Sequence, residues 1–70
     1  MEPREQFGRN VRGSRRAAGL SQEQLAERSG LHMTEISRLE RGVRDPRLAT
    51  IVRIAQGLDV PPAQLLADVG

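Results

Sequence analysis

The sequence predicts an all-α fold, and three observations lead to this class. Nowhere do four or more residues alternate cleanly between apolar and polar side chains, as a half-buried strand would require. Apolar residues instead recur every three or four positions, the spacing of a buried helix face. Four glycines are each followed by an aliphatic residue, a pattern typical of left-handed helix ends: Gly19-Leu20, Gly30-Leu31, Gly42-Val43 and Gly57-Leu58. These endings imply at least four helices.

Length and composition limit what the chain can be. Its 70 residues fit one domain, residues 1–70, whose core would give only about 3–5 kcal/mol of net stability. With no cysteine and one histidine, neither a disulfide framework nor a zinc site is expected, and no cofactor is inferred. No apolar run approaches the roughly 20 residues of a membrane span, and the N-terminus lacks a signal-peptide core. We therefore expect a cytoplasmic protein without membrane contact.

The charge is distributed unevenly along the chain. All eleven basic residues are arginines between Arg4 and Arg53, where seven acids also lie, so this part carries +4 (11 − 7). The remainder holds only Asp59 and Asp68. Such asymmetry is expected when one face meets a polyanion and the other meets protein. A GC-rich genome would also produce many arginines, so the composition alone does not decide.

The first helix is predicted from Pro3 to Ala18. Proline suits the first turn of a helix, and Gly19 follows at the expected end. Phe7, Val11 and Ala18 lie near one stripe, which predicts that they face the core. Phe7, the single aromatic residue, has no aromatic partner and is expected to anchor the core rather than stack on a base.

Two short helices follow, separated by a glycine turn. Ser21 and Gln24 form a capping box that opens a helix over residues 22–29, in which Leu25 and Ala26 are expected to be buried. The next helix, residues 33–41, would be about 14 Å long and bury Ile36 and Leu39. Its other face carries hydrogen-bonding side chains: Thr34, Glu35, Ser37, Arg38 and Arg41. A polar second helix after such a turn, over about residues 21–41, is the layout of a DNA-reading helix-turn-helix.

The last two helices are predicted over residues 46–56 and 62–67. Asp45 before Pro46 suggests an N-cap followed by a proline in the first turn. The fourth helix would bury the stripe formed by Leu48, Ile51, Val52 and Ala55. Ile54 lies beside this stripe and has no obvious place in one small core.

The motifs SQEQLAERSGLHMTEISRLERG and RDPRLATIVRIAQGLDV, in this order and spacing, resemble the Cro/CI-type (Xre) helix-turn-helix family of bacterial and phage transcriptional regulators. The resemblance covers roughly residues 7–66. It implies a compact five-helix, lambda-repressor-like DNA-binding domain whose third helix enters the major groove of double-stranded DNA.

The resemblance also implies roles for individual residues. Those expected to face base edges are Met33, Thr34, Ser37 and Arg38. Arg38 could bridge guanine O6 and N7, and Thr34 could offer its hydroxyl to a base or its methyl to thymine. Met33 replaces the polar residue often found at its place, so it would contact thymine methyls or simply pack. Glu35 is an acid near the phosphates, or an acceptor for cytosine N4, and its role stays open.

The remaining roles concern the DNA backbone and the interior. Backbone contacts are expected from the start of the second helix and from the basic residues around the third: Gln22, Arg41, Arg44 and Arg47. Arg15 and Glu40 resemble an internal ion pair that joins the first helix to the third.

Two function classes remain, with one favoured. The favoured one is a sequence-specific transcriptional regulator, a repressor that binds its operator as a homodimer. The candidate dimer patch consists of aliphatic residues near the C-terminus, which could instead complete the core: Ile54, Leu58, Val60 and Leu66. The alternative is a protein-binding module of the same fold, such as an antitoxin or a coactivator-like bridge. An enzyme is not expected, because His32, Glu35 and Ser37 on one short helix cannot converge as a triad. No small-molecule ligand is inferred.

Overall fold

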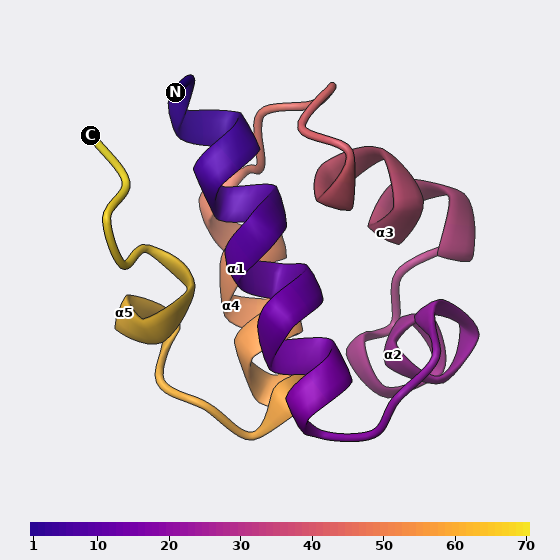
Figure 1. Ribbon diagram of the computed structural model, residues 1–70. Helices are drawn as coiled ribbons and strands as arrows, with labels where there is room; N and C mark the ends of the chain where they lie inside the picture. The colour runs from indigo at the N-terminus through magenta and orange to yellow at the C-terminus, as the bar shows by residue number, and fades with distance from the viewer.

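The computed structural model describes residues 1–70 and is all-α, as predicted (Figure 1). Its five helices are α1 (Pro3–Ala17), α2 (Gln22–Ser29), α3 (Met33–Glu40), α4 (Leu48–Leu58) and α5 (Pro62–Leu65). The predicted bounds of α2 are confirmed, while α1 and α3 each end one residue earlier than expected and α5 ends two residues earlier. None of these helices has the length and apolar character needed to cross a membrane.

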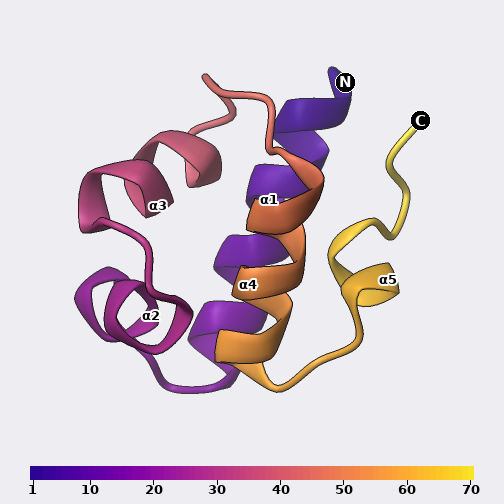
Figure 2. The same cartoon turned by 180° about the vertical axis from the view of Figure 1, so that it is seen from behind.

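Two opposite views show how the helices are arranged (Figures 1 and 2). α1 and α4 run through the middle of the molecule, α2 and α3 lie on one side of them, and α5 lies on the other. Both termini lie at the same end. α2 contacts both α3 and α4, while α5 contacts α1 and α4. The pair α2–α3 thus shares one flank of the domain, with one side of α3 left uncovered.

One hydrophobic core joins all five helices. Six large side chains are almost completely buried, among them the single aromatic residue: Phe7, Val11, Leu25, Ile36, Ile54 and Leu65. The predictions that Phe7, Leu25, Ala26, Ile36 and Leu39 face the core are confirmed. Every buried side-chain polar atom has a hydrogen-bond partner, so no side chain leaves an uncompensated polar atom in the interior.

Three of the four predicted glycine endings are confirmed. Gly19, Gly30 and Gly42 have φ near +73°, with values of 72°, 74° and 73°. In each case the next residue donates its backbone N–H five positions back, as Leu31 does to the Ala26 carbonyl at 3.1 Å. This bond satisfies a carbonyl that the helix end would otherwise leave free.

The predicted bounds of α4 were wrong at both ends. Asp45 is exposed and caps nothing, because residues 43–47 span the distance from α3 to α4 outside any helix, and α4 begins after Arg47. At the other end Gly57 is helical, and Asp59 takes the left-handed conformation with φ 57°. Gly57 instead allows α4 to cross α2 closely, because a Cβ at this position would lie 3.2 Å from the Ser29 backbone nitrogen.

The register of α4 also corrects the predicted core and the predicted dimer patch. Ile54 is 0% exposed and Leu58 6%, so both lie in the core and neither can form a surface patch. Leu48 is 78% exposed and Val52 also lies at the surface, although both were expected inside. α4 is covered by α1, α2 and α5 on more than one side, so its buried face is broader than a single stripe and displaced from it.

Polar contacts hold α5 and the segment after it against α1. The Asn10 Nδ2 donates to the carbonyl oxygens of Leu65 at 2.9 Å and Ala67 at 2.8 Å. The Gln6 Nε2 donates to the Asn10 Oδ1 at 2.9 Å. Leu65 ends a helix of only four residues and Ala67 lies just after it, so Asn10 supplies a partner for carbonyls that so short a helix leaves free.

Gly8 sets the distance between α1 and α3. A Cβ at this position would lie 2.4 Å from the carbonyl oxygen of Leu39 and 2.8 Å from that of Glu40. Both are backbone atoms of the last turn of α3, so they cannot turn aside as a side chain could. The absence of a side chain at Gly8 therefore allows α1 to touch the end of α3.

We expect Gly8→Ala to destabilise the domain by about 1–3 kcal/mol, because the added methyl would push α3 away from α1. Gly13→Ala, on the same helix with nothing within 4 Å of its Cβ, is the matched control. That control should stabilise the domain by about 0.5–1 kcal/mol, through the higher helix propensity of alanine. Urea unfolding of both variants measures the difference, and equal stabilities would contradict this account of Gly8.

Candidate nucleic-acid interface

The start of α2 lies at the surface and exposes free backbone donors. The Ser21 hydroxyl accepts from the Gln24 backbone nitrogen at 3.0 Å, and the Gln24 Oε1 accepts from the Ser21 nitrogen at 2.8 Å. This capping box confirms the predicted helix start. The N–H groups of Gln22 and Glu23 stand in the first turn, where no earlier helical carbonyl can accept them. They carry the partial positive charge of the helix N-terminus, which attracts anions.

α3 is divided into a buried side and an open side. Ile36 and Leu39 attach it to the core. The opposite side carries Thr34 and Arg38, both exposed, with Ser37 partly exposed and Met33 half exposed at 50%. Arg41 follows directly after the helix, and its Nε donates to the Ser37 carbonyl at 3.4 Å. The four residues expected to contact bases thus lie together on one accessible helix.

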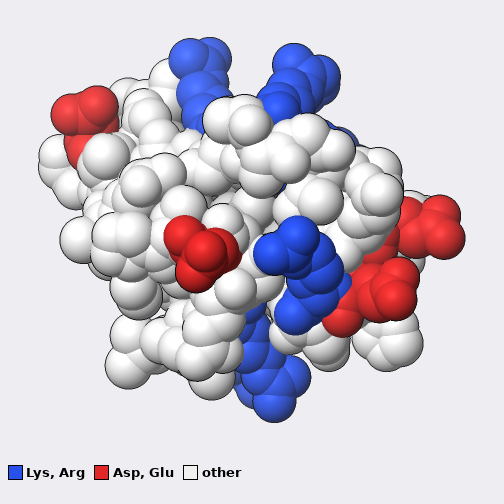
Figure 3. All heavy atoms as spheres, turned by 90° about the horizontal axis from the view of Figure 1, so that it is seen from below, with Lys and Arg blue, Asp and Glu red and all other residues white.

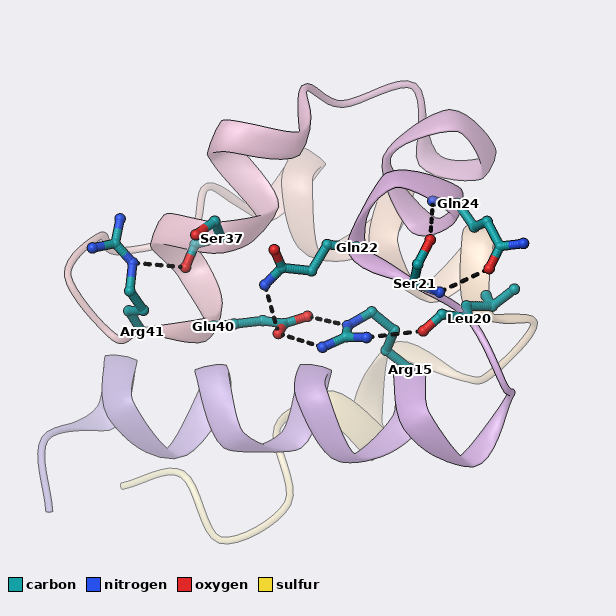
Figure 4. Close-up of polar contacts among 8 residues, drawn as sticks. All are labelled: Arg15, Leu20, Ser21, Gln22, Gln24, Ser37, Glu40 and Arg41. Carbon is teal, nitrogen blue, oxygen red and sulfur yellow. Dashed lines mark hydrogen bonds and ion pairs between the residues drawn. The ribbon is translucent and has the colours of Figure 1, made fainter.

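A buried ion pair connects α1 to α3, as the sequence suggested. The Arg15 Nε lies 2.6 Å from the Glu40 Oε2, and the Arg15 Nη2 donates to Oε1 at 2.9 Å (Figure 4). The Arg15 Nη1 also donates to the Leu20 carbonyl at 2.8 Å, in the connection that leads to α2. Arg15 thus takes the buried place on α1, whereas Ala18, expected in the core, is exposed. Two parallel hydrogen bonds between the planar guanidinium and carboxylate groups fix both the orientation and the distance of the two side chains.

The electrostatics of this pair favour the charged form of the arginine. Hydrogen bonding to Glu40 raises the pKa of Arg15 above its ordinary value, although burial acts in the opposite direction. The side chains are only 10% and 3% exposed, so the attraction is little screened by solvent. The guanidinium therefore stays protonated, and α3 is held by a permanent charge.

The position of Gln22 modifies its predicted role. Its side-chain Nε2 donates to the Glu40 Oε1 at 3.1 Å, so the amide is attached to the ion pair (Figure 4). Because a carboxylate only accepts hydrogen bonds, the side-chain nitrogen of Gln22 must point toward Glu40 and its side-chain oxygen away from it. A phosphate at this place would then be bound by the backbone N–H groups of α2 or by the second hydrogen on Nε2.

A groove of about 660 Å³ separates α3 from the first half of α4. Arg38 lines it from α3, while Arg44 and Arg47 line it from the connection between the two helices. Arg53 contributes from α4, a residue that the sequence analysis did not single out. Its place within a helix could be read from the sequence, but the side on which it lies depends on how α4 packs against α1, α2 and α5. Two carboxylates, Glu35 and Asp45, line the same groove.

Charges at another end of the molecule are arranged differently. Figure 3 shows the end where the α1–α2 and α4–α5 connections lie, and there arginines and carboxylates are scattered over a mostly uncharged surface. The groove therefore differs from this end, because it brings several arginines together.

Comparison with known proteins identifies the family. The sequence matches the helix-turn-helix family HTH_3 over residues 11–65. The chain belongs to this helix-turn-helix family. It is 43% identical over 70 residues to the control protein C.SmaI of Serratia marcescens, covering all of this chain and 83% of that protein. It is 39% identical over 67 residues to the transcriptional repressor RghR of Bacillus subtilis, covering 94% of this chain and 50% of that protein.

A solved structure supports the same assignment. The restriction-modification controller protein C.AhdI from Aeromonas hydrophila is 42% identical and superimposes with a TM-score of 0.86. The match covers 89% of this chain and 94% of that structure. This helix-turn-helix protein is thus a DNA-binding regulator of transcription, not an enzyme.

We expect Glu40→Ala to destabilise this helix-turn-helix domain by about 3–5 kcal/mol, because Arg15 would remain buried without a counter-charge. Thermal unfolding of the free protein measures the effect. Glu27→Ala, an exposed acid on α2, is the control and should change stability by less than about 0.5 kcal/mol. A melting temperature of Glu40→Ala equal to that of the wild type would refute a structural role for the pair.

Proposed function

We propose that this helix-turn-helix protein is a repressor that binds a two-fold symmetric operator as a homodimer. The observation that carries the proposal is the open side of α3, which presents Thr34, Ser37 and Arg38 while its other side is fixed by the core and by the Arg15–Glu40 pair. An α-helix fits the major groove, where each base pair presents a distinct pattern of donors and acceptors. A rigid helix with free polar side chains can read that pattern.

The proposed base contacts differ in what they contribute. The Arg38 guanidinium would bind guanine O6 and N7, worth about 1–3 kcal/mol of discrimination. Thr34 would contact a base edge or a thymine methyl, and Ser37 either a base edge or the flanking backbone. Met33, half exposed with no strong hydrogen-bonding group, would contact thymine methyls.

The proposed backbone contacts surround this helix. The α2 N-terminus at Gln22 would bind one phosphate through its free N–H groups. Arg41, Arg44 and Arg47, all exposed, would neutralise phosphates after α3. Such contacts position the protein on DNA and set its salt dependence without reading sequence.

The proposed dimer surface is moved from the predicted patch to the exposed apolar residues of α4. Leu48 and Val52 lie one turn apart on its outer side. Leu66, the exposed member of the predicted patch, lines the same shallow hollow as Pro46, two residues before Leu48. Val60 is partly buried against the core. A two-fold dimer would place two copies of α3 about 34 Å apart, one turn of DNA.

The relatives support regulation as the outcome of binding. C.SmaI is named a control protein, C.AhdI a restriction-modification controller and RghR a repressor. An operator that overlaps a promoter would be blocked by the bound dimer, which is the simplest way for so small a domain to repress. As a DNA-binding regulator it would act in the cytoplasm, where the bacterial chromosome lies.

The proposed function is tested by selecting a randomised duplex library on the protein at two salt concentrations and sequencing the bound DNA. We expect a two-fold symmetric motif that persists at the higher salt. Arg38→Ala should lose the preference for guanine at one position of each half-site, with a cost of about 1–3 kcal/mol. Absence of any enriched motif would instead favour a protein-binding module of the same fold.

The dimer is tested separately by sedimentation equilibrium of Leu48→Ser. We expect the variant to be monomeric at concentrations where the wild type is dimeric. Because Leu48 contributes little to the core, the variant should unfold at nearly the same temperature as the wild type diluted until it is monomeric. Val43→Ser, which also removes an exposed aliphatic side chain but lies before α4, is the control. A monomeric wild type, or unchanged association of Leu48→Ser, would contradict the proposed surface.

A further inference from the structure

We propose that the groove between α3 and α4 seats one sugar-phosphate strand of the bound duplex, with Arg53 as a phosphate ligand and Glu35 as a charge that weakens binding to DNA of any sequence. This inference rests on the proposed function and extends its interface from α3 and the following connection to α4.

The position of the groove leads to this occupant. Arg38, proposed to read a base, and Arg53 line the same hollow from facing helices. The major groove is about 12 Å wide and bordered by the phosphates of both strands. A helix lying in it therefore has a phosphate backbone along each side. Because α3 and α4 both line this groove, its mouth is where such a backbone would pass.

The charges in the groove favour an anion. Arg38, Arg44, Arg47 and Arg53 line it against only two carboxylates. Arg53 is exposed, and the one ion pair in the structure joins Arg15 to Glu40, so no carboxylate of this chain forms an ion pair with Arg53. An arginine that meets a phosphate releases condensed counterions, and this release drives binding.

Glu35 acts against this attraction. It lies in the first turn of α3, is partly buried, and lines the groove together with the four arginines. No hydrogen-bond donor or cation of this chain pairs with its carboxylate, so its charge repels any phosphate that enters. The repulsion is the same for every sequence, whereas the Arg38 contact to guanine is made only at the correct site. Glu35 therefore lowers affinity for random DNA while leaving base recognition intact.

The test measures the affinity of four proteins for one mixed-sequence duplex over a series of salt concentrations. The proteins are the wild type, Arg53→Gln, Glu35→Gln and the control Arg28→Gln, an exposed arginine on α2 outside the groove. We expect Arg53→Gln to weaken binding and to reduce the slope of log K against log salt by about 0.9, the value for one phosphate contact. Glu35→Gln should bind more tightly, with a gain that shrinks as salt screens the repulsion. Arg28→Gln should match the wild type, and unfolding curves check that all four are folded.

The outcomes separate this inference from the proposed function. A wild type that binds with a clear salt dependence, together with an Arg53→Gln variant whose slope equals that of Arg28→Gln, would overturn the groove contact and leave the proposed function standing. A wild type that binds no duplex at all would overturn both. If Glu35→Gln alters the base preference in the library selection but not the affinity for mixed-sequence DNA, Glu35 reads a base and its proposed role is wrong.

Discussion

The arrangement of the side proposed to face DNA depends on the buried pair of Arg15 and Glu40. Arg15 reaches from α1 to the Leu20 carbonyl and to Glu40 at the end of α3, and Gln22 at the start of α2 completes the set. These contacts join the three segments that an approaching duplex would meet. Taking two charges out of water costs several kcal/mol, which their attraction offsets only when the geometry is good and the remaining hydrogen bonds are made. The pair thus mainly fixes the position of α3, because a displacement of this helix would separate the two charges and leave each of them buried without its partner.

The rest of the fold brings these segments close enough for the pair to form. Gly8 allows the backbone of α1 to touch the last turn of α3, and Gly57 allows α4 to cross α2 closely. Because the helices lie close together, a small hydrophobic core is sufficient to hold them. α3 is then attached by Ile36, Leu39 and the Arg15–Glu40 pair, and its opposite side remains exposed.

The proposed interface is not uniformly basic, and this is consistent with a sequence-specific regulator. A surface of arginines alone would bind every duplex tightly, whereas occupation of one operator requires a large ratio of specific to non-specific affinity. Glu35 and Asp45 line the groove beside the arginines, and their carboxylates would reduce the sequence-independent part of the attraction. The hydrogen bond from the Gln22 side chain to Glu40 similarly holds this amide in place at the start of α2, beside the free backbone N–H groups of that helix.

The sequence by itself determined the number and order of the helices, because most of their ends are specified locally. The capping box of Ser21 and Gln24 and the left-handed residues Gly19, Gly30 and Gly42 act through hydrogen bonds within a few residues, and each was predicted correctly. The polar side of α3 and the Arg15–Glu40 pair were also predicted, the first from helical spacing and the second from the family resemblance. Only the tertiary structure decided the register of α4, with Ile54 buried, Leu48 exposed and Gly57 inside the helix. That register depends on neighbours from α1, α2 and α5, which no local pattern encodes. The place of Arg53 in the groove that α3 also lines, and the hydrogen bond from Gln22 to Glu40, likewise depend on how different helices pack together.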